Sequence, residues 1–149
     1  MIPPFDDEGD LPAGVHRATW AEFRDRFCHF VRSDRRLRLC ERIEQLVLAA
    51  RRSGIVEQLI FSGSFVTAIP EPNDFDVMVI FHASVDVANL QPHQLDLVDG
   101  ARARHCFQGD LFPVRSGTDR ASKLLSFFQH TRLGKPVGVV EVLFDDQKQ

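Results

Sequence analysis

The sequence predicts a single α/β or α+β domain over residues 1–149, with a mixed sheet of about four strands flanked by helices. Apolar residues recur at helical spacing in the first third of the chain, which predicts two N-terminal helices. After Gly54 they gather into short runs that are typical of strands. A chain of 149 residues with 44% apolar content is also long enough to bury one core.

The N-terminal third should contain the two helices. Prolines and a glycine interrupt residues 1–18, which we expect to be an irregular lead-in. Thr19-Trp20-Ala21-Glu22 has the form of a capping box, so a helix of about 10 residues should begin there. A longer helix should run from Ser33 or Asp34 to about Ser53. Its polar face is basic, which favours a solvated surface over one that binds RNA or an acidic protein. The arginines of this face are Arg35, Arg38, Arg42, Arg51 and Arg52.

Strands and helices alternate in the remainder of the chain. The expected strands are Val56–Phe61, Phe75–Phe81, Asp110–Val114 and Val137–Phe144. The expected helices are Ala101–Phe107 and Asp119–Thr131. The first of these could begin as early as Pro92. Residues 145–149 form a polar tail.

Composition narrows the class of protein. The net charge of −3 argues against non-specific coating of nucleic acid, although it leaves room for a local basic face. Apolar runs such as Val77–Phe81 are too short to span a bilayer, and Met1–Asp10 lacks the order of a signal peptide. Cys28, Cys40 and Cys106 form no CxxC pair, and their odd number suits reduced thiols. We therefore expect a cytoplasmic protein with no membrane partner.

Two carboxylates mark the start of the second predicted strand. Residues two apart in a strand point to the same face, so Asp74 and Asp76 should project together. At a separation of about 4 Å they would repel by roughly 4 kcal/mol, unless a proton or a cation compensates them. Oxygen ligands of this kind suit a hard divalent ion, Mg²⁺ (or Mn²⁺).

A glycine–serine pair precedes these carboxylates. Gly63 permits a tight turn after the strand that ends at Phe61, with no Cβ to obstruct a ligand. Ser64 can cap a short helix over Phe65–Ala68, whose free N–H groups would bind a phosphate. The turn and the carboxylates would then bracket a metal–triphosphate unit. The alternative is a turn and a cap without a ligand.

Gly63-Ser64 followed by Asp74-x-Asp76 resembles the signature of the DNA-polymerase-beta-type nucleotidyltransferase superfamily. Further segments are similar to a group of small bacterial nucleotidyltransferase-like proteins, and the likeness covers most of the chain. These segments are Leu11–Trp20, Gly63–Thr67, Glu71–Asp74, Phe127-Phe128-Gln129, Arg132 and Lys135-Pro136-Val137-Gly138.

The resemblance implies transfer of a nucleoside monophosphate from a nucleoside triphosphate to a hydroxyl of a protein, an RNA or a small molecule. Asp74 and Asp76 would be catalytic metal ligands, together with a third carboxylate on a later strand, for which Asp110 is best placed. Gly63 and Ser64 would bind phosphate. The cations that could assist are Arg115, Lys123, Arg132 and Lys135. Small members of the superfamily occur in toxin–antitoxin and defence systems, which implies a toxin or antitoxin partner.

Other features favour a second hypothesis. The chain lacks the Arg-Gly pair that many members carry after the serine, and no helical domain follows the sheet. Both absences favour a non-catalytic nucleotidyltransferase-like binding partner, such as an antitoxin. Asp110 could also pair with Arg102 or Arg104, and His16 is better explained by a structural hydrogen bond than by a role as a ligand.

Overall fold

The computed structural model describes residues 1–29 and 32–144, so the expected tail at 145–149 lies outside the described residues. The strands are β1 (Gly14–Thr19), β2 (Val56–Ser62), β3 (Asp76–Phe81), β4 (Asp110–Arg115) and β5 (Gly138–Leu143). They form a five-stranded sheet in the order β1-β5-β2-β3-β4. The pairs β1–β5 and β3–β4 are parallel, whereas β2 is antiparallel to both β5 and β3. The sheet is therefore mixed, as predicted.

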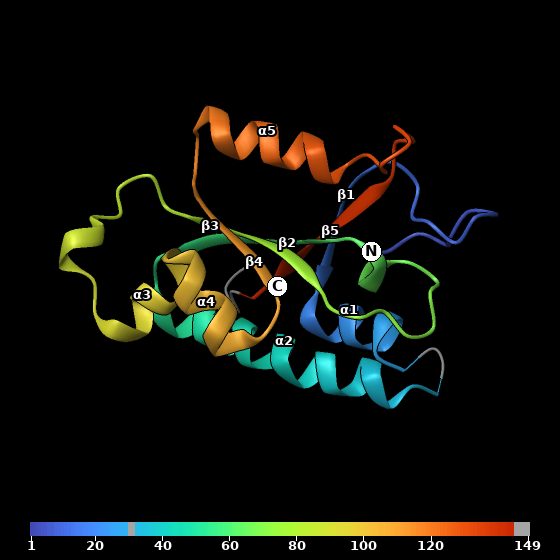
Figure 1. Ribbon diagram of the computed structural model, residues 1–149, viewed down its shortest axis with the longest axis horizontal. Helices are drawn as coiled ribbons and strands as arrows, with labels where there is room; N and C mark the ends of the chain where they lie inside the picture. Colours follow the sequence, from blue (N-terminus) through green and yellow to red (C-terminus); the bar gives the residue numbers. More distant parts are fainter. Residues whose placement is uncertain (30–31, 145–149) are drawn as a thin grey trace.

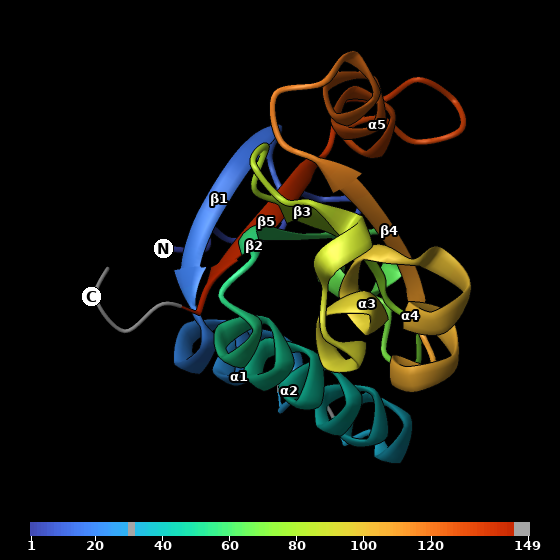
Figure 2. The same ribbon diagram turned by 90° about the vertical axis from the view of Figure 1, so that its left-hand side faces the viewer.

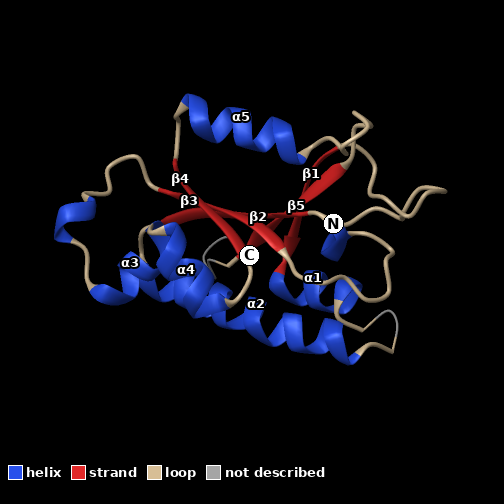
Figure 3. Cartoon of the chain, in the orientation of Figure 1, coloured by secondary structure: helices blue, strands red, loops and turns tan. Residues whose placement is uncertain are grey.

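Helices cover both faces of this sheet. They are α1 (Trp20–Phe27), α2 (Asp34–Ser53), α3 (Pro92–Val98), α4 (Gly100–Phe107) and α5 (Asp119–Phe128). Helices α1 to α4 lie on one face, and α5 lies alone across the other (Figures 1 and 2). Figure 3 shows the resulting three layers, with the strands in the middle. None of the helices within the described ranges is long and apolar enough to cross a membrane.

The sheet has one strand more than the sequence predicted. Gly14–Thr19 pairs in parallel with β5, from Gly14 opposite Gly138 to Thr19 opposite Leu143. The expectation of an irregular lead-in throughout residues 1–18 is therefore wrong for its last five residues. The partner of this edge strand comes from the other end of the chain, and the local composition carries no sign of it.

The signals at helix ends are confirmed. Thr19 Oγ1 accepts a hydrogen bond from Glu22 N at 3.1 Å, and Glu22 Oε1 accepts one from Thr19 N at 2.9 Å. Ser33 caps α2, which ends at Gly54 in the left-handed conformation (φ 70°). The region from Pro92 to Phe107 forms two helices, because Asp99 caps α4. Helix α5 ends at Phe128, three residues earlier than expected.

Strand β3 is central and apolar on both faces, as predicted. Val77 and Val79 belong to the larger core, beneath α1 to α4. Met78 and Ile80 belong to a smaller core, which packs against α5. Because side chains alternate along a strand, Asp76 shares the α5 face with Met78. The first carboxylate of the strand thus faces the side of the sheet that α5 covers only in part.

Two of the cysteines are paired, which corrects the expectation of reduced thiols. Cys28, at the end of α1, forms a disulfide with Cys40 in α2, 12 residues later. Cys106 is free and exposed. The pairing depends on how α1 turns back onto α2, and the spacing of the cysteines alone does not reveal this.

Candidate metal centre

Three carboxylates converge at one end of the sheet. Asp74, Asp76 and Asp110 each offer an oxygen, and these atoms all lie within 4.8 Å of one another. Asp76 begins β3 and Asp110 begins β4, and the parallel register places the two residues opposite each other. The structure therefore brings together all three residues that the sequence analysis nominated as metal ligands.

A close backbone contact positions Asp110. The Asp110 N–H donates to the carbonyl of Phe75, which lies between the other two acidic residues, at 3.0 Å. The Phe75 ring packs against Gly109, where an added Cβ would come within 2.3 Å of the ring. Gly109 is thus required for the start of β4 to approach β3 this closely. The sequence analysis missed this glycine, although its place directly before Asp110 was a usable signal.

The triad concentrates negative charge. Burial, followed by the charges of Asp74 and Asp110, raises the pKa of Asp76 to about 7. Burial, followed by a hydrogen bond to Asp110 and its charge, also raises the pKa of Asp74. The ion pairs found among the described residues involve other carboxylates. Arg102, for example, pairs with Asp96 at 2.9 Å, so the alternative that Asp110 is its partner does not hold.

The end of β2 lies directly beside the triad. Gly63 has φ +75°, and a Cβ added to it would come within 2.2 Å of Asp76 Oδ2. Ser62 lies opposite Asp76 in the antiparallel register, so the two side chains share a face. The Ser62 hydroxyl is buried and has no hydrogen-bond partner among the described residues. An unpartnered polar group next to crowded carboxylates fits a site that binds a ligand.

The turn after Gly63 differs in detail from the prediction. A single 3₁₀ turn forms over Ser64–Val66, and Ser64 does not cap it through its side chain. The expected helix over Phe65–Ala68 is therefore wrong. Thr67 explains the early end, because its hydroxyl donates to the Ser64 carbonyl at 2.7 Å and closes the turn. The first N–H groups of such a turn still have no partner within it.

A buried arginine holds this loop. Arg36 is inaccessible to solvent, and its guanidinium donates to five backbone carbonyls. These carbonyls belong to Phe27, Phe65, Thr67, Ile69 and Pro70. The guanidinium also lies 4.8 Å from the centroid of the Phe65 ring, and burial lowers its pKa to about 10. Sequence analysis did not single out Arg36, although its spacing to Leu39, Cys40 and Ile43 places it on the apolar stripe of α2.

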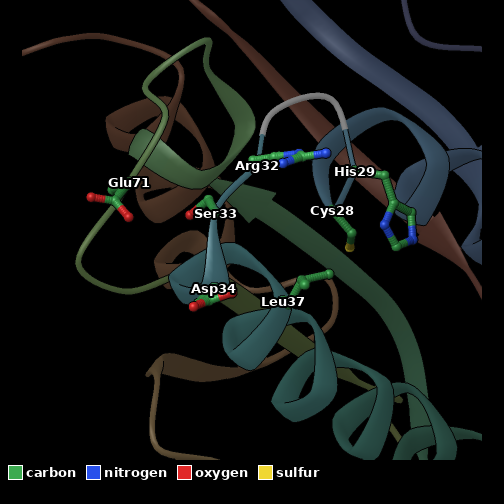
Figure 4. A pocket seen from close by; sticks show the side chains of 7 residues that line it. All are labelled: Cys28, His29, Arg32, Ser33, Asp34, Leu37 and Glu71. Atoms are coloured by element: carbon green, nitrogen blue, oxygen red, sulfur yellow. The ribbon is translucent and has the colours of Figure 1, made fainter.

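Asp76, one carboxylate of the triad, lines a pocket of about 900 Å³. Gly63, Ser64 and Asp76 line one part of it, while Phe127 and Arg132, from the end of α5 and the loop after it, line another. A separate pocket of about 520 Å³ lies where the chain enters α2 (Figure 4). Its lining residues are Cys28, His29, Arg32, Ser33, Asp34, Leu37 and Glu71, so it includes none of the triad.

The four candidate phosphate-binding cations lie in different places. Arg132 lines the pocket of the triad. Lys135 does not line it, and its ammonium contacts Asp6, Glu8 and Asp10 at 2.7 to 2.9 Å, which raises its pKa. Arg115 donates to the carbonyls of Ala83 and Val85. Lys123 lies on α5 in a shallow pocket that also includes Phe127.

Two residues singled out in the sequence have structural contacts. His16 lies 2.6 Å from the Pro12 carbonyl through Nε2, which confirms that it makes a structural hydrogen bond. Arg35, from the basic face of α2, donates to Asn73 Oδ1 at 3.0 Å. Part of that face therefore supports the segment that leads to Asp74.

A family model described as "Family of unknown function (DUF6932)" matches residues 3–143. No curated protein and no solved structure matches the chain.

Proposed function

The chain belongs to DUF6932, a family of unknown function, and we propose that it is a metal-dependent nucleotidyltransferase. It would move a nucleoside monophosphate from a nucleoside triphosphate to a hydroxyl of a protein, an RNA or a small molecule. The observation that carries the proposal is the convergence of Asp74, Asp76 and Asp110 within 4.8 Å, with Asp76 lining a pocket together with the Gly63-Ser64 turn.

The donor set fits a divalent ion. All three groups are carboxylates, which suit Mg²⁺ or Mn²⁺ and leave coordination sites for substrate phosphates. Burial, followed by the neighbouring carboxylates, raises the pKa values of Asp74 and Asp76, and a bound cation would offset both effects. The missing Cβ at Gly63 leaves the Asp76 carboxylate open on the side of the turn.

Each residue of the site would have a distinct role in the reaction. Asp74 and Asp76 would hold the metal, which supplies neutralisation of phosphate charge and a lower pKa for the acceptor hydroxyl. Asp110 would be a further ligand or would accept the hydroxyl proton. The N–H groups of the turn at Ser64 would bind a phosphate, and Arg132 would offset its charge. The acceptor oxygen then bonds to the α-phosphorus as the bond to the β-phosphate oxygen breaks, and pyrophosphate leaves.

Calorimetry with the four ribonucleoside triphosphates, with and without Mg²⁺ or Mn²⁺, tests the proposal. We expect binding that requires the metal and is lost in Asp76→Asn and Asp110→Asn, while the exposed Asp25→Asn retains it. Labelled nucleotide should then transfer to an acceptor in cell extract only with the wild-type protein. Absence of metal-dependent binding to the folded wild type would contradict the enzyme and favour the non-catalytic partner.

The acceptor and the partner follow from the same proposal. The acceptor would be a protein or an RNA, and the resemblance separately implies a toxin–antitoxin or defence pair as the setting. Mass analysis of the labelled acceptor from that extract distinguishes the two.

A further inference from the structure

Phe127 is an exposed aromatic residue that lines the same pocket as Asp76. Its relative exposure is 72%, whereas Phe23, Phe61 and Phe75 are almost completely buried. It lies in the last turn of α5 and lines the same pocket as Asp76 and Gly63. Because it lines a pocket that also contains a carboxylate, this open aromatic ring is placed to contact a ligand there.

The Phe127 ring is supported from one side. It makes an edge-on contact with Phe128, with ring centroids 5.7 Å apart and planes at 61°. Phe128 packs in turn on Phe112 of β4 at 5.1 Å and belongs to the smaller core. This chain of rings anchors Phe127 to the sheet and leaves most of its surface open to solvent.

We propose that Phe127 is the platform on which the base of the bound nucleotide stacks, and this inference rests on the proposed function. The pocket of about 900 Å³ extends from Asp76 and Ser64, which would bind the metal and the phosphate, to the aromatic end of α5. A nucleoside triphosphate has the matching order of groups, with anionic phosphates at one end and a flat π system at the other. Stacking on a phenyl ring accepts any base, so Phe127 would favour nucleotides over plain polyphosphates.

The location also supplies a surface for the base within the α/β fold itself. Arg132, in the loop that follows α5, lines the same pocket. The end of α5 and this loop thus supply an aromatic face and a cation from adjacent segments. The triphosphate would lie between them and the carboxylates.

The test compares two probes on one set of variants. Binding of ATP and of inorganic tripolyphosphate, each with Mg²⁺, is measured for the wild type, Phe127→Ala and Phe127→Trp. Leu133→Ala is the control, because Leu133 is 99% exposed and does not line the pocket. We expect Phe127→Ala to weaken ATP binding about tenfold and to leave tripolyphosphate binding unchanged. Phe127→Trp should retain ATP binding.

Each other outcome overturns the inference. Unchanged ATP affinity in Phe127→Ala would show that the base does not contact the ring. Equal loss of ATP and tripolyphosphate affinity would mean that the substitution disturbs the phosphate site, and loss of ATP binding in Phe127→Trp would exclude stacking. If neither probe binds the wild type, the proposed function fails as well, which distinguishes that result from the other three.

Discussion

Gly63 lies against the carboxylate of Asp76, so closely that a Cβ at position 63 would come within 2.2 Å of Oδ2. The contact arises because β2 ends where β3 begins in the antiparallel pair. It makes the turn after β2 and the first carboxylate of β3 one structural unit. A phosphate bound at the turn and a metal bound at Asp76 would therefore be neighbours.

Gly63→Ala should abolish metal-dependent nucleotide binding. The new Cβ must displace the Asp76 carboxylate, and the backbone conformation of Gly63 (φ 75°, ψ −164°) adds about 1–3 kcal/mol of strain for any other residue. Gly117→Ala is the matched control, because Gly117 has φ +78° and a Cβ added there meets no atom within 4 Å. Gly117→Ala should lose only the stability that the backbone strain costs, Gly63→Ala should lose more in thermal unfolding, and Gly117→Ala should still bind metal and nucleotide in calorimetry. Wild-type binding by Gly63→Ala would contradict the role of this contact.

Those parts of the site that depend on local sequence patterns could be predicted from the sequence. The spacing of Asp74 and Asp76 predicted that they lie together, and the Gly63-Ser64 pair predicted a turn beside them. The third carboxylate, Asp110, followed from the resemblance, because only the parallel register of β4 with β3 brings it to Asp76. The role of Gly109 could not be predicted from its neighbours, because it depends on contact with the Phe75 ring of another segment.

The same limit applies to the fold: features set by neighbouring residues could be predicted, and those set by distant residues could not. Capping residues such as Thr19 and Ser33 act within a few positions of themselves, and the structure confirms them. Strand β1 and the Cys28–Cys40 disulfide depend on partners brought together by folding, and the sequence analysis did not find them. Arg36 combines both kinds of feature. Its place on the apolar stripe of α2 is a local pattern, whereas the carbonyls that it binds lie in distant segments.

The contribution of Asp76 to stability without metal should fall as the pH rises from about 4 to about 7. The pKa of Asp76 rises from 3.8 to about 7 on folding, so in this range the folded protein binds more protons than the unfolded chain. Deprotonation therefore costs the folded state free energy, whereas bound Mg²⁺ would favour the deprotonated carboxylate.

Thermal unfolding across this pH range, in chelator and in Mg²⁺, measures the effect. The difference in Tm between wild type and Asp76→Asn isolates the contribution of Asp76 from that of other acids. In chelator, the wild type should lose Tm relative to Asp76→Asn as the pH rises, and Mg²⁺ should restore it. A difference that is independent of pH would show that folding does not raise the pKa of Asp76.

Replacing Arg36 should damage both stability and the site. Arg36→Met leaves five carbonyls, two of them buried, without their donor, which should cost about 3 kcal/mol or more. Arg36→Lys should recover only part of this, because one ammonium cannot reach carbonyls spread from Phe27 to Pro70. Chemical denaturation measures the loss, and the exposed Arg38→Met on the same helix is the control.

Nucleotide affinity separates the two effects of Arg36. At a temperature where Arg36→Lys remains folded, its binding of Mg²⁺ and nucleotide should be weaker than that of the wild type, since the loop from Phe65 to Pro70 is less well held. Equal affinity in the folded variant would limit Arg36 to a structural role.

Reduction of the Cys28–Cys40 disulfide should lower stability and leave the triad intact. The bond closes a short loop between α1 and α2, and a loop of this size is typically worth about 2–3 kcal/mol through the entropy of the unfolded chain. The Cys28→Ser/Cys40→Ser variant should therefore match the reduced wild type in denaturant unfolding, while Cys106→Ser should match the oxidised one. Neither cysteine lies in the pocket of Asp76, so nucleotide binding should persist after reduction at temperatures where the protein is folded. If the reductant leaves the unfolding midpoint unchanged, the two thiols are not bonded in solution, as the sequence analysis expected.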